Sequence, residues 1–346
     1  MKNKFPLAVM LLVAVCLTNC RKDNSVAEEN LTLNSDGSVM AASGVPVHSV
    51  ITIAGRPYTS GQTLVNANGK NARFNNPFGI QLMDDGTIYV ADTDNKTIRM
   101  VSPNADVTSL NVPDHTMVNP AFWLKGPKYF GIDNNGAIFI IDQDPAYPHD
   151  KAMFYKSSGD FIGGYWSDYY DVKDIVKDPF GNAFYTTFGN QLQRVTLKQS
   201  NKTFNYPSVD FTNSFLPDAP GYYTFPAIFM GNNGVIYFVY KGKLYKRSKD
   251  GTGAAIFQNL SFTDVTCIMA NKDSRTLYIA DKGYIRRIDN GILTTITGPN
   301  SNYNDSRDGI GIRADVYAKY LALSKDESTI YFSDPKADAI RKIVLR

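Results

Sequence analysis

The side chains best suited to chemistry are carboxylates that follow short apolar runs. They are Asp92, Asp94, Asp142, Asp144, Asp281 and Asp334. Several carboxylates that converge on one point can hold a hard cation such as calcium, and they then form a ligand or metal site. Alternatively, each aspartate accepts backbone N–H bonds and shapes its own turn, which is its usual role at such a position. We expect the second role for most of the six and keep the first as a hypothesis.

Other catalytic patterns are weak. The histidines are His48, His115 and His149, and their positions do not supply the three ligands that a zinc site needs. A string at residues 304–309, followed by Asp315, loosely follows the order of a calcium loop but departs from it at several ligand positions. The chain has no G-x-S-x-G turn and no glycine-rich phosphate loop. We therefore predict no catalytic residue, and a metal-dependent lyase or hydrolase stays the alternative to a binding function.

Aromatic side chains offer a second kind of site. Trp166, Tyr169 and Tyr170 lie close together in a segment that we expect to form a loop. Exposed aromatic rings can stack on sugar faces or anchor a peptide or protein partner. The alternative is that such rings pack over the body of the domain. The sequence therefore predicts a glycan, peptide or protein ligand without choosing among them.

Charge and composition exclude some classes of function. There are 36 Lys and Arg against 33 Asp and Glu, a net charge of +3, and removal of Lys2 and Lys4 with the N-terminal segment leaves +1. No basic field is available to hold nucleic acid. The chain has 21 Tyr and 20 Phe but only 2 Trp, and this aromatic content favours strands. Cys267 lies in an apolar run and is expected to be a buried thiol.

The N-terminus reads as an export signal. A basic start is followed by an apolar stretch at residues 5–17, which is too short to span a bilayer but typical of a secretory signal. The stretch ends in Leu17-Thr18-Asn19-Cys20, which resembles a bacterial lipobox. We predict a signal peptide at 1–19, a lipid on Cys20 that anchors the chain to the membrane, and a polar tether at 20–46. The expected location is the bacterial outer membrane, facing the periplasm or the outside.

The rest of the chain repeats. Six segments share an apolar run, a tight turn, a second apolar run, a polar turn and a third alternating run, about 40–55 residues apart. This spacing predicts an all-β, six-bladed β-propeller over residues 47–346, with four-stranded antiparallel blades. Fourth strands are predicted at 106–110, 161–165, 203–206, 254–258 and 293–296. The sixth is predicted at 49–53, so that the N-terminal strand completes the last blade and hides both sheet edges.

The first repeat carries a family resemblance. ITIAG at 51–55, NARFNNPFGI at 71–80 and GTIYVADTDNKTIR at 86–99 together resemble the NHL repeat, and LYIAD at 277–281 and IYFSD at 330–334 keep part of it. The resemblance covers residues 48–346 and implies a six-bladed propeller of the kind carried by exported lipoproteins of Bacteroidetes. We therefore expect a non-catalytic binding or scaffold module at the cell envelope. The alternative lyase or hydrolase would have its site at the mouth of the central channel, where second-to-third-strand turns meet the links between blades.

Overall fold

The computed structural model describes residues 44–346 apart from several gaps. The gaps are 57–63, 111–123, 144–149, 157, 159, 167–171, 173, 182, 189–190, 198–203, 206–207, 211–224, 249–250 and 303–305. Several predictions therefore fall outside the described residues: the signal, the lipid on Cys20, most of the tether, and the roles of Asp144, Tyr169, Tyr170, His115 and His149. The side chain of Trp166 is also outside them.

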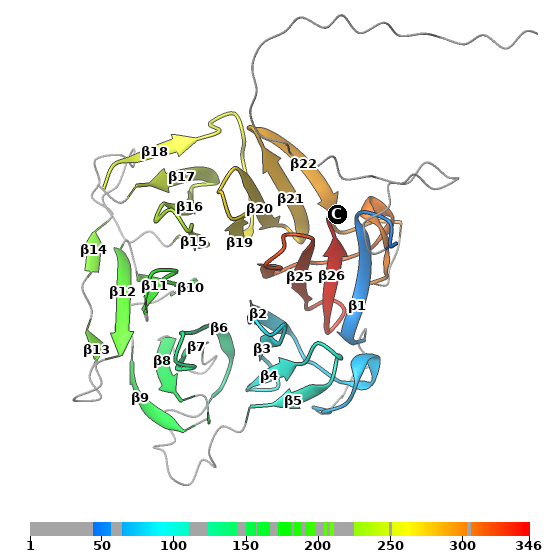
Figure 1. Cartoon of the computed structure of the whole chain (residues 1–346), viewed down its shortest axis with the longest axis horizontal. Coiled ribbons are helices and arrows are strands. Elements are labelled where there is room, and N and C mark those ends of the chain that lie inside the picture. Colours follow the sequence, from blue (N-terminus) through cyan, green and yellow to red (C-terminus); the bar gives the residue numbers. More distant parts are fainter. Residues whose placement is uncertain are drawn as a thin grey trace, which may run out of the picture.

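The described chain forms six antiparallel sheets around a central axis, which confirms the predicted all-β six-bladed propeller (Figure 1). The first blade holds β2 (Pro77–Leu82), β3 (Ile88–Asp92), β4 (Thr97–Val101) and β5 (Val107–Ser109). The second holds β6 (Pro127–Ile132), β7 (Ile138–Gln143), β8 (Asp150–Tyr155) and β9 (Phe161–Trp166). The fourth holds β15 (Ile228–Met230), β16 (Ile236–Tyr240), β17 (Lys243–Arg247) and β18 (Gly253–Ile256). The fifth holds β19 (Val265–Ala270), β20 (Thr276–Asp281), β21 (Tyr284–Asp289) and β22 (Ile292–Thr297).

Short turns fix the register of these blades. The turns between first and second strands place Gly86, Gly136 and Gly234 at φ angles of 85°, 78° and 75°. Glycine adopts such left-handed angles without the steric cost that a side chain would bring. Each strand then pairs with its neighbour in sequence, as where Ile80 lies opposite Val90 in the first blade. The first strand is thus at one edge of its sheet, and this edge, as for β2, β6 and β10, lies nearest the axis (Figure 1).

The third blade departs from the prediction at its outer edge. It holds β10 (Ile175–Lys177), β11 (Phe184–Phe188) and β12 (Gln191–Leu197), and its outer strand is split into β13 (Phe204–Asn205) and β14 (Ser208–Asp210). Both short strands pair with β12. The residues of β14 lie beyond the fourth strand predicted at 203–206 and also belong to the sheet, because a break in the outer strand lets the chain return to the same partner.

The sixth blade closes the ring. It holds β24 (Leu321–Leu323), β25 (Thr329–Asp334), β26 (Ala339–Val344) and the N-terminal β1 (Ser49–Gly55). As predicted, β1 pairs antiparallel with the C-terminal strand, with Ile51 opposite Lys342 (Figure 1). A short fifth strand, β23 (Gly309–Ile310), pairs with β1 beside the four predicted strands.

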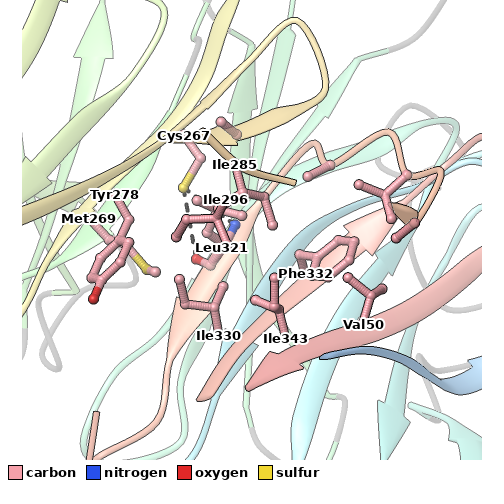
Figure 2. Packing of buried hydrophobic residues seen from close by; sticks show 14 residues of the cluster. Val50, Cys267, Met269, Tyr278, Ile285, Ile296, Leu321, Ile330, Phe332 and Ile343 are labelled. Atoms are coloured by element: carbon pink, nitrogen blue, oxygen red, sulfur yellow. Dashed lines mark hydrogen bonds between the residues drawn. The ribbon is translucent and has the colours of Figure 1, made fainter. Parts of the chain in front are cut away.

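The core lies between neighbouring blades. Val50 of β1 packs with Phe332 and Ile343 of the sixth blade, in a cluster that also includes Cys267 of the fifth blade (Figure 2). Cys267 is 2% exposed, which confirms the predicted buried thiol. The described part of the chain has two 3-10 turns, η1 (Gly69–Asn71) and η3 (Gly311–Arg313), and none of its helices is long and apolar enough to cross a membrane.

Candidate functional site

Asp92 and Asp334 hold the links between blades. Asp92 accepts a hydrogen bond from Asn75 N at 2.8 Å and forms an ion pair with Arg99 at 2.8 Å, and both side chains of the pair are fully buried. Asp334 accepts a bond from Tyr317 N at 3.2 Å and pairs with Arg341 at 2.8 Å. In both cases the carboxylate joins the incoming link to a cation on the third strand of its own blade.

Asp142 and Asp281 repeat this arrangement. Asp142 accepts Gly126 N at 2.7 Å and pairs with Lys151 at 3.1 Å. Asp281 accepts Asp264 N at 2.8 Å and lies 3.4 Å from a guanidinium nitrogen of Arg286. All four carboxylates accept backbone N–H bonds as expected, but these N–H groups belong to the incoming link, 16 or 17 residues earlier, and not to the turn that follows the aspartate. Among the residues that the structure describes, no group of three or more His, Cys, Asp or Glu side chains is placed to hold a metal ion.

The arginine partners were missed from the sequence, although a signal was present. Arg99 and Arg341 both follow their aspartate by seven residues. Arg99 also donates to Arg73 O at 2.8 Å and Val65 O at 2.9 Å, so one buried guanidinium joins two points of the incoming link to the first blade. Burial raises the pKa of Asp92 despite the opposing effect of the guanidinium beside it. Such a pair is costly to break, because either partner alone would leave a buried charge.

The remaining predicted carboxylates are separated. Asp94 is exposed and accepts a bond from Asn76 Nδ2 at 3.4 Å. In the calcium-like string, Asp308 pairs with Arg341 at 2.9 Å. Asp315 instead accepts Asn300 N at 2.9 Å and pairs with Lys336 at 2.8 Å. The two acids of the string therefore serve different partners.

A cavity of about 680 Å³ occupies the central channel. All six blades line it through the inner strands, with apolar side chains along its walls. These include Ile80, Leu82, Phe130, Ile175, Phe229, Met230, Ile268, Met269, Leu321 and Leu323. Polar residues of the turns between first and second strands, including Asp84, Asn232, Lys272 and Glu327, form its mouth. An apolar body with a few polar groups at one end is a common design of ligand pockets.

The mouth lies at the opposite end of the channel from the predicted carboxylates. Asp92 pairs with Pro77, the first residue of inner strand β2, whereas the cavity residues Gln81 and Leu82 end that strand. We expected the site where second-to-third-strand turns meet the links, but the observed cavity opens among the first-to-second-strand turns. The sequence pattern does not show which end is open, because both ends carry polar turns.

A hydrogen bond across the axis closes the inner end of the cavity. The hydroxyl of Tyr320, just before β24, donates to Asp174 Oδ1 at 2.7 Å, just before β10. These residues belong to the sixth and third blades, which face one another across the ring (Figure 1). Tyr320 lines the cavity and packs against core clusters on several sides. The two partners are 146 positions apart in the sequence, so no local pattern signals their contact.

Asp174 is the most perturbed acid at the axis. Its Oδ2 accepts Ile228 N at 2.9 Å, and its side chain is fully buried. Burial raises the pKa of Asp174 to about 7, against the lowering effect of the bonds from Ile228 and Tyr320. The thiol of Cys267, which lies near this group, is likewise raised in pKa by burial. The inner end of the cavity thus holds groups that are neutral at mildly acidic pH.

Comparisons with known proteins place the fold. No family model matches the sequence, and no curated protein matches it. An auxiliary nutrient binding protein of Bacteroides thetaiotaomicron superposes with a TM-score of 0.62 at 14% identity, over 90% of this chain and 82% of that one. An auxiliary nutrient binding protein from Bacteroides ovatus superposes with a TM-score of 0.61 at 13% identity, over 89% of this chain and 82% of that one. A catalytically inactive H270A virginiamycin B lyase from Staphylococcus aureus, with quinupristin, superposes with a TM-score of 0.50 at 15% identity, over 82% of this chain and 99% of that one. At such identities the likeness shows a shared fold and no more.

Proposed function

We propose that this chain is a non-catalytic binding module whose ligand enters the central cavity from the side of the first-to-second-strand turns. The observation that carries the proposal is the cavity itself. It has a volume of about 680 Å³, apolar walls from six blades, a polar mouth and an inner end closed by the Tyr320–Asp174 bond. Its volume is in the range of pockets that take small organic molecules or peptide side chains.

The four buried aspartates support binding over metal catalysis. Asp92, Asp142 and Asp334 spend their oxygens on backbone N–H groups and on buried cations. Asp281 likewise accepts backbone N–H groups, and its cation partner Arg286 is partly exposed. A carboxylate that is held in this way has little capacity left for a metal or a reacting group. The channel offers shape and apolar surface instead.

We further propose the cellular setting that the sequence predicts. The chain is an NHL-type propeller, exported and tethered to the bacterial outer membrane through a lipid on Cys20. The likeness to Bacteroides proteins described as nutrient binding is consistent with this setting. Its ligand would then be a glycan, a peptide or another molecule met at the cell envelope.

A thermal-shift screen tests the cavity as the site. Purified protein is heated with defined sugars, dipeptides and medium-chain fatty acids. A ligand at a hundredfold excess over its Kd stabilises the native state by about 2.7 kcal/mol. Ala322 lines the cavity, so Ala322→Trp should abolish any shift by filling the space. Ala254→Trp, on the exposed face of β18, is the matched control and should preserve it. A shift that survives Ala322→Trp would refute the cavity as the binding site.

A further inference from the structure

The polar groups at the cavity mouth are unevenly distributed. Lys177, Asn232 and Lys272 come from the third, fourth and fifth blades, which are neighbours in the ring. Within the described part of the structure, their side chains make no hydrogen bond or ion pair, while Lys177 is half-buried and the other two are exposed. Three side chains with free N–H donors therefore border one side of the mouth.

The acids of the mouth come from the first and sixth blades and are engaged. Asp84, from the first blade, pairs with Lys325 at 3.4 Å. Glu327, from the sixth blade, accepts a hydrogen bond from the backbone N of Lys272. The charged residues that line the cavity are thus three lysines and two acids. The surplus positive charge and the free donors both lie on the third to fifth blades.

Apolar surface continues from the walls to the same side of the mouth. Pro179 of the third blade lines the cavity, and its neighbour Phe180 is 57% exposed. Met230 and Met269 contribute flexible side chains to the wall below. Methionine adapts its shape to irregular ligands. An apolar body can therefore lie along this wall while its polar end stays at the lysines.

We propose that the cavity takes an amphipathic anion: an apolar body in the channel, with a carboxylate, sulfonate or phosphate group held by Lys177, Asn232 and Lys272. This rests on the proposed function, since it names the class of ligand for the same cavity. An anionic head group accepts hydrogen bonds from the N–H donors and offsets the surplus positive charge, whereas a cationic head group would face the ammonium groups of Lys177 and Lys272. The inner end of the cavity does not compete with the mouth for the anionic head group, because the Tyr320 hydroxyl already donates to Asp174.

A matched pair of fluorescent probes tests the class of ligand. 1-Anilinonaphthalene-8-sulfonate and N-phenyl-1-naphthylamine share their aromatic rings, but only the first carries a negative charge. Both are titrated into the purified full chain at low salt. In Lys177→Gln/Lys272→Gln, the affinity for the sulfonate should fall about tenfold relative to the neutral probe, the sum of two partly exposed ion pairs. Raised salt should weaken binding of the sulfonate probe to the parent protein more than binding of the neutral probe.

Three further variants separate this proposal from the proposed function. Lys246→Gln/Lys282→Gln removes the same charge at exposed positions that do not line the cavity, and it should leave the ratio of the two affinities unchanged. Ala322→Trp and Met230→Trp fill the cavity from different blades and should remove both probes, with circular dichroism as the check on folding. If both probes still bind to folded cavity-filled variants, the cavity itself is refuted. If these variants lose both probes but the lysine variant keeps the parent ratio, only the anionic class is overturned.

Discussion

Asp174 should make the stability of the propeller fall as the pH rises. Its pKa is about 7 in the folded chain, because the carboxyl is fully buried, against about 3.9 for an unfolded aspartate. The folded pKa lies above the unfolded one, so the native state holds an extra proton between about pH 4 and pH 7. Stability from this group is therefore complete at low pH and is lost as the pH rises through that window.

The structure sets the size of the effect. Each pH unit between the two pKa values is worth about 1.36 kcal/mol, so the whole difference is about 4 kcal/mol. About 3 kcal/mol of it falls between pH 5 and pH 8. Asp174→Asn removes the titration. It also turns an amide N–H toward one of the donors Ile228 N or Tyr320 Oη, which costs about 1–3 kcal/mol at every pH.

The assay is urea unfolding of the parent and of Asp174→Asn at half-unit steps from pH 5 to pH 8. Because other groups titrate alike in both proteins, the difference between their unfolding free energies isolates Asp174. We expect Asp174→Asn to have the lower unfolding free energy at pH 5. By pH 8 the difference between the two proteins should move by about 3 kcal/mol in favour of the variant, because only the parent loses stability as Asp174 deprotonates. Tyr320→Phe removes the hydroxyl that donates to the Asp174 carboxylate, which should raise the pKa of Asp174 further. The loss of stability with rising pH should therefore end at a higher pH in this variant than in the parent. A deficit that stays constant to within about 1 kcal/mol across this range would refute the reasoning.

Two other predictions follow from the links and from the N-terminus. Arg99→Met leaves Asp92 as an uncompensated buried charge and should cost about 3–5 kcal/mol in urea unfolding. Lys325→Met breaks a largely exposed pair and should cost less than about 1 kcal/mol, so equal costs for the two variants would contradict the role given to Arg99. In a bacterial host, Cys20→Ala should move the chain from the membrane fraction to the soluble fraction. A parent protein that is itself soluble and lacks a lipid-modified N-terminal peptide by mass spectrometry would show that Cys20 is not acylated.

The blades follow from local sequence. Each hairpin joins neighbouring runs through a short turn, so alternation of apolar residues and the placement of Gly, Asn and Asp suffice to locate the strands. Even the closing strand was predictable, because VITIAG at 50–55 repeats the pattern of LTTITG at 293–298. Irregular pieces were not: β23 and the split β13–β14 pair carry only two or three residues each, which is too few to show a period.

The candidate site depended on contacts that no local pattern encodes. The sequence by itself determined six blades, the closing strand and four aspartates that accept backbone N–H bonds, because all of these rest on residues of one repeat or on matching strand patterns. Only the closed ring brings Tyr320 to Asp174 across the axis, and gathers lysines from separate blades at one mouth. The physical reason is that blades are local hairpins, whereas the channel is formed only when all six inner strands face a common axis.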